Sequence, residues 1–477
     1  MNFDGDYRML IGGELASGSA TLDVVNPATE EVIARVPDAT RDDLDKAIAA
    51  ARAAFPGWAA TPIEERKAKL TALGQALLAQ ADPFMRLLTK EQGKPHAEAQ
   101  GEVMGAGYWL LGAAALDLPV TVNEDSEERY SETRHVPLGV VGAIAPWNFP
   151  MVLAMFKVGP ALLAGNTMVL KPSPFTPLTT LKFGEIAREI LPPGVLNIVT
   201  GGDDLGPWMT SHPGFDKISF TGSTATGKRV MQSAAPTLKR VTLELGGNDA
   251  AIVMPDVDVE KVAEELFWAA FRNNGQICIA TKRMYVHKDI YEPLKQALVA
   301  YAKTVKIGDG SEQGTQIGPI NNRQQYERVL DLIQDAKDKG YRFLIGGEKA
   351  EVPGYFIPVT ILDNPPEDSR IVQEEQFGPV LPLIRFEEYE DVIARANATD
   401  YGLGGSVWGK DEDKALEIAQ RIASGTVWVN ETQHLSPGAA FGGMKQSGVG
   451  VEGGVEGLLE YTNAQTIVRR RKAAATA

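Results

Sequence analysis

Apolar positions divide this chain into a mainly helical N-terminal third and a longer remainder, in which short apolar runs alternate with helix-length segments. Thr40 and Asp43 form a capping-box pattern at the start of the clearest helix. Apolar residues then recur at intervals of three and four from Leu44 to Phe55. Because proline lacks the backbone N–H that a helix interior uses, this helix is predicted to end before Pro56.

The remainder of the chain carries two sets of apolar runs. The first set is LGVVGAIAP, TMVLKPS, GVLNIVTG, KISFTG and VTLELGG, and the second is AAIVMP, RMYVHKDI, GYRFLIGG, FGPVLPLIRF and GTVWVN. Helical segments, including 257–274 and 321–339, separate the runs of the second set. Alternation of this kind predicts parallel strands joined by crossover helices, and therefore an α/β fold with two parallel-sheet domains.

Two further segments fit neither domain. Residues 120–134 are extended, polar and acidic, without a helical period. Near the C-terminus, the sequence YTNAQTIV has a strand-like pattern. Each is predicted to protrude or to pair elsewhere.

Length and charge limit the function classes. At roughly 150 residues per domain, 477 residues indicate two or three domains. Lys and Arg number 47 against 62 Asp and Glu, which gives a net charge of −15. Because this charge repels phosphate backbones and acidic membrane surfaces, neither nucleic acid nor a membrane is an expected partner.

Cysteine and histidine usage points to a cytoplasmic protein without a metal site. Cys278 is the single cysteine, so no internal disulfide can form, and the five histidines show no metal-ligand spacing. The acidic start has no apolar core of signal-peptide length, and the most apolar stretches are interrupted by Pro146, Pro150 and Lys157.

A glycine-rich turn after the run KISF is a candidate nucleotide site. Residues 222–229 nearly match a phosphate-binding P-loop, but Arg229 stands where a Ser or Thr hydroxyl would hold magnesium. A helix opening at Ser223 or Thr224 offers free backbone N–H groups to an anion such as pyrophosphate. The alternatives are an ordinary strand-to-helix turn and, as a rival function, a P-loop phosphotransferase.

Three residues are candidates for chemistry, each with a structural alternative. Cys278 is a nucleophile or a small buried apolar residue. Glu244 closes an apolar strand before two glycines, where a general base or a solvated carboxylate would stand. Asn148 lies between two prolines and either donates to an oxyanion or belongs to a rigid turn. A Cys–His hydrolase would need His287 or His434, and neither carries a recognisable signature.

Seven motifs occur in the order and spacing of the aldehyde dehydrogenase superfamily, which the chain resembles over almost its whole length. They are PWNFP, KPS at Lys171, FTGS at Phe220, LELGG around Glu244, GQIC at Cys278, EEQFGPV from Glu374 and FGGMKQSG from Phe441. The intact active set argues against the rival of a catalytically idle protein on this fold.

The resemblance implies a role for each candidate. Cys278 would attack the aldehyde carbonyl to give a thiohemiacetal, and Asn148 would stabilise the oxyanion with the Cys278 backbone N–H. Hydride transfer would then leave a thioester. Glu244 would activate the water that hydrolyses this thioester, and relatives that pass the acyl group to coenzyme A generally lack this glutamate. The product implied is a carboxylic acid.

The resemblance also implies a dinucleotide bound by a variant Rossmann domain. The matching cofactor residues are Ile144, Trp147, Lys171, Gly222, Ser223, Glu375 and Phe377. Many NAD-preferring members carry Glu three residues after the lysine, where this chain has Pro174. NAD is the first expectation, because no second basic residue stands near Lys171 in sequence, and NADP stays open.

Substrate choice follows from the residues that match the family's tunnel. These are Met104, Tyr108, Phe149, Phe156, Ile277, Ile279, Leu435 and Phe441. Since most are apolar, a medium-sized aliphatic or aromatic aldehyde is favoured. Arg272 indicates an alternative substrate, a semialdehyde whose carboxylate it would pair with. Otherwise Arg272 is a solvated or intersubunit arginine.

The domain organisation implied has three parts. Residues 1–117 and 137–246 would form the NAD(P)-binding domain, and residues 247–447 the catalytic domain. Residues 118–136 and 448–477 would form an oligomerisation arm and tail, which predicts a homodimer or homotetramer.

Overall fold

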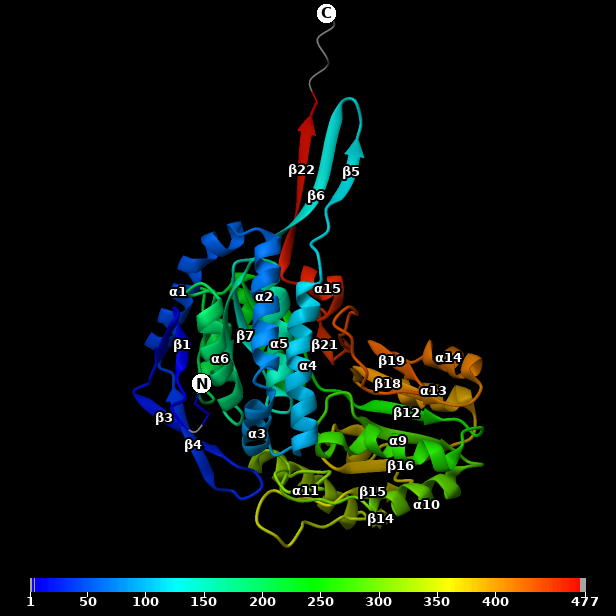
Figure 1. Ribbon diagram of the computed structural model, residues 1–477. Helices are drawn as coiled ribbons and strands as arrows, with labels where there is room; N and C mark the ends of the chain where they lie inside the picture. The colour runs from blue at the N-terminus through cyan, green and yellow to red at the C-terminus, as the bar shows by residue number, and fades with distance from the viewer. Residues whose placement is uncertain (1, 4, 472–477) are drawn as a thin grey trace, which may run out of the picture.

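The computed structural model describes residues 2–3 and 5–471, arranged as two α/β units with a projecting arm (Figure 1). The first unit is built on an eight-stranded sheet. Its strands, in spatial order, are β2 (Glu14–Ala16), β1 (Met9–Ile11), β9 (Leu196–Ile198), β8 (Thr167–Lys171), β7 (Val140–Ile144), β10 (Lys217–Thr221), β11 (Arg240–Glu244) and β21 (Gly448–Val449). The five strands from β9 to β11 are parallel, as the first set of apolar runs predicts.

Helices cover both faces of this sheet, which explains why its central strands are apolar throughout. On one face lie α1 (Arg41–Ala60), α7 (Leu205–Ser211) and α8 (Thr224–Ala234), followed by the 3₁₀ turn η1 (Ala235–Thr237). On the other lie α5 (Pro150–Leu163) and α6 (Leu178–Ile190), backed by α2 (Ile63–Leu78), α3 (Ala81–Gln92) and α4 (His96–Ala114). A hairpin of β3 (Ala20–Val25) and β4 (Val32–Asp38) precedes α1.

The predicted end of the first helix is wrong. The capping box of Thr40 and Asp43 is present, but α1 continues through Pro56 to Ala60. The last turn is held by tertiary packing, because the buried Trp58 donates its indole N–H to the carbonyl of Leu162 at 3.1 Å. Packing of this kind offsets the hydrogen bond that the proline removes.

The second unit has a seven-stranded sheet in the order β14 (Phe343–Ile345), β15 (Thr360–Asp363), β16 (Val380–Phe386), β13 (Thr281–His287), β12 (Asp249–Val253), β18 (Gly404–Trp408) and β19 (Thr426–Val429). One face packs against α9 (Val259–Phe271) and α10 (Tyr291–Ala302). The other packs against α11 (Arg323–Asp338), α12 (Arg370–Gln373), α13 (Tyr389–Asn397) and α14 (Glu412–Ala419). The α/β class with two parallel-strand sheets is confirmed.

Smaller elements complete the chain. They are the 3₁₀ turn η2 (Arg272–Gly275), the strand pair β17 (Tyr401–Gly402) and β20 (Met444–Lys445), and α15 (Gly454–Leu459). The predicted helix over 257–274 is therefore shorter, with a turn at its end. Each sheet falls within one of the predicted units, except that β21, assigned to the tail, pairs with β11 in the first sheet. The division into three parts itself stays a prediction.

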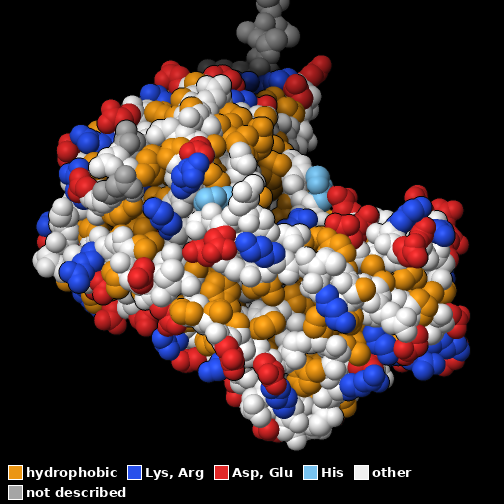
Figure 2. All heavy atoms as spheres, turned by 60° about the horizontal axis from the view of Figure 1, so that its bottom comes forward, with side chains coloured by type: hydrophobic (Ala, Val, Ile, Leu, Met, Phe, Trp, Pro, Cys, Tyr) orange, Lys and Arg blue, Asp and Glu red, His pale blue; other side chains and the backbone are white. Residues whose placement is uncertain are grey.

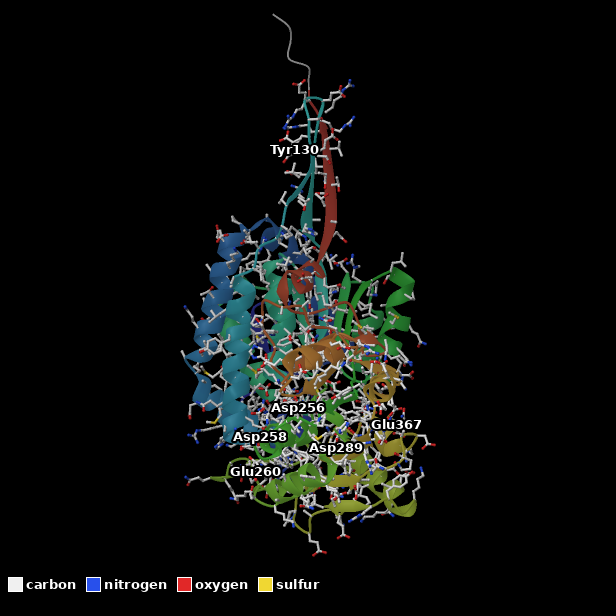
Figure 3. All side chains as sticks on the ribbon, turned by 90° about the vertical axis from the view of Figure 1, so that its right-hand side faces the viewer. Tyr130, Asp256, Asp258, Glu260, Asp289 and Glu367 are labelled. Atoms are coloured by element: carbon white, nitrogen blue, oxygen red, sulfur yellow. The ribbon has the colours of Figure 1, made fainter. Side chains whose placement is uncertain are left out.

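The arm is a three-stranded sheet that projects from the body (Figure 1). It consists of β5 (Thr121–Asp125), β6 (Arg129–Pro137) and β22 (Thr462–Arg470), with β6 in the middle. Tyr130, labelled near the top of Figure 3, lies under the guanidinium groups of Arg469 and Arg471, at 5.6 and 5.8 Å from its ring centre. These cation–π contacts join β22 to β6 at the end farthest from the body.

Charged groups of both signs are interspersed over the face shown in Figure 2, with hydrophobic side chains scattered among them. No helix among the residues that the structure describes combines the length and the apolar character needed to cross a lipid bilayer.

Candidate active site

A cleft of about 870 Å³ opens at the carboxyl ends of the first sheet's parallel strands, next to the second unit. Its volume lies in the range of about 300–1,000 Å³ that is typical of small-molecule and cofactor sites. It brings together seven of the predicted site residues: Trp147, Asn148, Gly222, Ser223, Cys278, Glu375 and Phe377. Parallel α/β sheets place ligands at this edge, so the location follows from the topology.

Asn148 lies in the turn between β7 and α5, buried against the loop that carries Cys278. Its side-chain Nδ2 donates to the carbonyl of Gln276 at 3.0 Å. Its own carbonyl accepts from Lys94 Nζ at 2.8 Å and from Asn273 Nδ2 at 3.1 Å. These bonds fix both the backbone and the amide of Asn148 relative to the loop that carries Cys278.

A buried ion pair that the sequence analysis missed supports this turn. Lys94 Nζ lies 2.6 Å from Glu102 Oε2, and both side chains are fully buried. Glu102 Oε1 accepts from the backbone N–H of Met151 at 2.8 Å, at the start of α5. Glu98, one turn earlier on α4, accepts from the backbone N–H of Asn273 at 3.1 Å. The sequence did contain a signal for this ion pair: a lysine is followed by two glutamates that stand four residues apart on one helix face.

Cys278 follows η2, whose Asn273 and Asn274 have φ values of 50° and 58°. This left-handed turn, which Asn tolerates better than most residues, redirects the chain from α9 towards the cleft. Desolvation at the floor of the cleft raises the pKa of the Cys278 thiol to about 12, and the carboxylates of Asp249, Glu375 and Glu244 add to the rise. Lys282 acts in the opposite direction. A base or a favourable charge is therefore needed to form the thiolate at neutral pH.

Glu244 ends β11, directly before Leu245 and Gly246, which line the cleft. It is buried, and neither carboxylate oxygen has a hydrogen-bond partner among the described residues. Burial raises the pKa of Glu244 well above its usual value, the charge of Glu452 raises it further, and Lys157 opposes the rise. A buried carboxyl group with a raised pKa, next to a cleft, has the properties of a general acid–base group.

Lys157 and Glu452, beneath Glu244, were also missed. Lys157 Nζ lies 2.6 Å from Glu452 Oε1 and donates to Thr221 Oγ1 at 2.7 Å and Ser219 Oγ at 3.2 Å. Both partners of the pair are buried. They set the local field that Glu244 experiences, and no local pattern in the sequence indicates their pairing.

The part of the cleft where the cofactor is predicted to bind is formed by the start of α8 and by the segment after α12. Ser223 caps α8 and accepts from the backbone N–H of Thr226 at 3.3 Å. A Cβ on Gly222 would lie 2.5 Å from the Phe220 ring, so this turn requires glycine. Glu375 Oε1 accepts from the backbone N–H of Gly247 at 3.0 Å. A helix N-terminus facing a cleft suits the pyrophosphate of a dinucleotide.

Trp147 and Phe377 form an aromatic wall of the same cleft. Their ring centres lie 5.3 Å apart in an edge-to-face arrangement. Phe377 has a φ of 51°, a conformation rare for a bulky residue. Strain of this kind is found at ligand-binding positions, where the surrounding structure holds it.

Ile144 and Lys171 are not in the cleft's lining but stand at the ends of β7 and β8, paired with each other in the sheet. Ile144 is buried in the core. Burial lowers the pKa of Lys171 to about 8, while the carboxylates of Asp203 and Asp38 oppose the shift. Lys171 is therefore a desolvated ammonium with two acids in its vicinity.

Most of the predicted substrate residues belong to one hydrophobic cluster together with Cys278. Its members from the prediction are Phe149, Phe156, Ile277, Ile279, Leu435 and Phe441. Phe156 is stacked on Trp109, with ring centres 4.0 Å apart, and Lys94 Nζ lies 3.6 Å from the centre of the Phe149 ring. Of the two other tunnel residues, Met104 is half-buried and Tyr108 is exposed.

Arg272 is set apart from the other predicted substrate residues. It is exposed, between α9 and the turn that leads to Cys278. Desolvation raises the pKa of the half-buried Glu98, and the charge of Arg272 opposes this rise. The contact of Arg272 with a substrate carboxylate stays a prediction.

The model of the aldehyde dehydrogenase family matches residues 15–467. The chain therefore belongs to the aldehyde dehydrogenase family. A relative from Pseudomonas sp. named "Probable aldehyde dehydrogenase" is 43% identical over 465 residues, which cover 97% of this chain and 94% of the relative. The phenylacetaldehyde dehydrogenase of Pseudomonas fluorescens is 39% identical over 480 residues, covering 97% and 95%.

The betaine aldehyde dehydrogenase of Staphylococcus aureus, solved in complex with NAD⁺, has the same fold. It is 33% identical, with a TM-score of 0.95, and the match covers 98% of this chain and 96% of that chain. This aldehyde dehydrogenase is thus an oxidoreductase that uses NAD(P). Family membership decides against the P-loop phosphotransferase. The glycine-rich turn at Gly222 lines the cleft, and its contact with a dinucleotide stays a prediction.

Proposed function

We propose that this enzyme oxidises an aldehyde to the carboxylic acid with NAD(P) and water, through a thiohemiacetal and a thioester on Cys278. The observation that carries the proposal is the cleft itself, in which Cys278 and Asn148 face the dinucleotide loop at Gly222. A panel of aldehydes tests it, with reduced cofactor followed by absorbance and the acid product identified. Turnover without the acid would contradict the hydrolytic route.

In the first step, the Cys278 sulfur bonds to the aldehyde carbon and the carbonyl oxygen becomes an oxyanion. The second N–H of the Asn148 amide and the backbone N–H of Cys278 donate to this oxygen. One such donor contributes roughly 2.7–4 kcal/mol to transition-state stabilisation. The bond from the first Asn148 N–H to Gln276 holds the amide in place for this task.

NAD(P) fits the remaining part of the cleft, because the start of α8 lines a volume that the described residues leave open. When bound, NAD(P)⁺ would supply the acceptor for the hydride of the thiohemiacetal carbon. Gly222 and Ser223 hold the pyrophosphate, Lys171 the adenosine ribose and Glu375 the nicotinamide ribose. Trp147 and Phe377 form the wall, and Ile144 supports it from the core at the end of β7 without lining the cleft.

Glu244 completes the reaction on the thioester. Its carboxylate takes a proton from water, and the hydroxide attacks the acyl carbon while the C–S bond to Cys278 breaks. The products are the carboxylic acid and the Cys278 thiolate, and the proton held by Glu244 returns to the sulfur to give the free thiol. The carboxylate oxygens of Glu244 support this role, because they have no hydrogen-bond partner among the described residues and are therefore free to accept from the attacking water.

An apolar or aromatic aldehyde of medium size is the substrate that the lining supports, because Phe149, Leu435 and Phe441 offer few polar partners. A semialdehyde whose carboxylate pairs with Arg272 is the second candidate, supported by the exposure of that guanidinium. Relatives named for phenylacetaldehyde and for betaine aldehyde show that both apolar and charged aldehydes belong in the panel.

Cofactor preference is predicted to be modest, with NAD used better than NADP. Pro174 lies next to Phe175, which lines the cleft, and brings no carboxylate to the ribose. Replacing Pro174 by Glu is expected to lower kcat/KM for NADP at least about tenfold through repulsion of the 2′-phosphate, with NAD use retained. Steady-state kinetics with both cofactors measure this ratio.

Pro174→Gln is the matched control, because it removes the proline without adding charge. An equal loss of kcat/KM for NADP in Pro174→Gln would show that the effect comes from the altered turn and not from the added charge. A wild-type enzyme with higher kcat/KM for NADP would overturn the NAD assignment, and an unaltered ratio in the Glu variant would show that this position does not face the ribose.

A homodimer or homotetramer is the proposed assembly, with β22 as the strand that joins subunits. β22 pairs with β6 from Thr462 to Arg470, and apolar Ile467 and Val468 are exposed on it. An exposed edge strand with apolar side chains is a template for strand addition. Because the enzyme relies on a free thiol, a reducing compartment such as the cytoplasm is the proposed location.

Ending the chain at Thr462 is expected to give smaller or insoluble species, because it removes most of β22. This end keeps the buried Tyr461, whose hydroxyl donates to Ser219 at 3.1 Å, so the core is preserved. A chain that ends at Arg471 retains β22 and is the control. Light scattering compares the two, and an unchanged oligomer in the shorter chain would remove β22 from this role.

A further inference from the structure

Lys282 is a buried lysine whose ammonium group points back at the loop that holds Cys278. It lies near the start of β13 and is almost completely excluded from solvent. Its Nζ donates to the carbonyl of Cys278 at 2.7 Å, to that of Ile277 at 2.9 Å and to that of Ala280 at 3.4 Å. The Lys282 ammonium thus binds three carbonyl oxygens of a single turn, and this turn contains Cys278.

The same ammonium faces the cofactor half of the cleft. Its Nζ lies 3.7 Å from Glu375 Oε1, the oxygen that also accepts from the backbone N–H of Gly247. Gly246 and Gly247, between β11 and β12, make this close packing possible. A Cβ on Gly246 would lie 2.3 Å from Glu375 Oε2, and one on Gly247 would lie 2.6 Å from the Cys278 carbonyl oxygen.

The groups that act on Cys278 come from four elements. Asp249 at the start of β12, Glu375 after α12 and Glu244 at the end of β11 each make ionisation of the thiol harder. Lys282 on β13 is the cation that makes it easier. Lys282 also favours ionisation of Asp249 and Glu375, so its charge is shared among three acidic groups.

We propose that Lys282 is a positioning residue that holds the Cys278 loop and stabilises the thiolate, and that Glu375 weakens this effect by drawing on the same ammonium charge. The inference rests on the proposed role of Cys278 as the nucleophile. Lys282 touches neither the aldehyde nor the cofactor in this scheme: it acts through the carbonyls of the turn and through its charge.

The test is the pH dependence of alkylation of Cys278 by iodoacetamide, with the labelled site identified by mass spectrometry. Since Cys278 is the single cysteine, every thiol label reports on it. Lys282→Met keeps the length of the side chain and removes the charge, and Lys282→Arg keeps the charge. Glu375→Gln removes the opposing charge and retains an oxygen that accepts from Gly247.

Lys282→Met is expected to raise the apparent pKa of Cys278 and to slow alkylation near neutral pH, about tenfold for each unit of pKa. Lys282→Arg is expected to restore most of the rate. Glu375→Gln is expected to change the rate in the opposite direction and to speed alkylation. Loosening of the loop without an electrostatic role would speed alkylation in both the Met and the Gln variants.

An unchanged pH profile in Lys282→Met, or faster alkylation in it, overturns the inference. If that variant does not fold, Lys282→Gln takes its place, because it keeps an N–H donor for the turn and removes the charge. An unchanged or faster rate in Lys282→Gln overturns the inference. Alkylation does not require turnover, so this result is separate from the proposed function, which fails instead if the enzyme remains active without Cys278.

Discussion

Replacement of Cys278 by Ala is expected to abolish aldehyde oxidation while dinucleotide binding stays nearly intact. The sulfur forms the covalent bond to the substrate, so its loss removes the pathway and not only a favourable contact. We expect kcat to fall by at least about 10⁴-fold, as for other nucleophiles that act as part of a unit. Absorbance of reduced cofactor measures the turnover, and quenching of tryptophan fluorescence measures the binding, with Trp147 in the cleft wall.

Cys278→Ser is the matched control. It keeps a polar atom at the same position, but a serine hydroxyl is a much weaker nucleophile than a thiolate. Both variants should therefore bind NAD(P) and fail to turn over. Because the substituted side chain is small and partly exposed, neither change is expected to disturb the core. Retained turnover in the Ala variant would contradict the covalent mechanism.

Most of the parallel strands in both sheets were predictable, because parallel strands covered on both faces read as unbroken apolar runs. All five residues of β7, β8 and β10 are buried, so no polar position interrupts the pattern. β18 was not predicted, since its Gly404 and Gly405 weaken the strand pattern. Glycine is required at position 404 by a tertiary contact, because a Cβ there would lie 2.3 Å from Asp249 Oδ2. A constraint of that kind is invisible along the chain.

Local capping was predictable, while the end of a helix was not. Thr40 and Asp43 are three residues apart, and their reciprocal hydrogen bonds depend only on each other. The continuation of α1 past Pro56 depends on Trp58 reaching Leu162, which lies 104 residues away. Proline propensity is a weak guide where tertiary contacts hold the next turn.

The candidate site also contains residues that the sequence indicated and residues that only the fold brings into place. Cys278, Glu244 and Asn148 stand next to strand ends or tight turns, which made them candidates, but their own sequence left each with a structural alternative. The order of seven motifs, and not any single residue, favoured the chemistry. The supporting groups were missed because their pairing is long-range: Lys157 and Glu452 are 295 residues apart, and only the folded sheet brings them beneath Glu244.

Replacement of Glu244 by Gln is expected to impair thioester hydrolysis more than hydride transfer. The Gln side chain has nearly the same size but cannot accept a proton from water. We expect the steady-state rate to fall by about 10²–10⁴-fold, the usual contribution of a general base. A rapid burst of reduced cofactor, close to one equivalent per active site, should precede this slow phase. Stopped-flow absorbance resolves the two phases.

The role of Glu244 as a base also predicts how the steady-state rate depends on pH. Glu244 must be deprotonated to act as a base, and burial with the charge of Glu452 raises its pKa well above the ordinary value. The steady-state rate of the wild type should therefore fall as the pH drops through this raised pKa, at a higher pH than an ordinary carboxyl group would produce. The same inflection should be absent from Glu244→Gln.

Glu452→Gln is the matched control for the electrostatic part of this prediction. Removing the nearby negative charge lowers the pKa of Glu244, so the inflection should move to lower pH while hydrolysis continues. If Glu244 also deprotonates Cys278, the burst in Glu244→Gln slows as well, and the steady state is still the slower phase. An unaffected steady-state rate in Glu244→Gln would refute the assignment, because water would then be activated by another group.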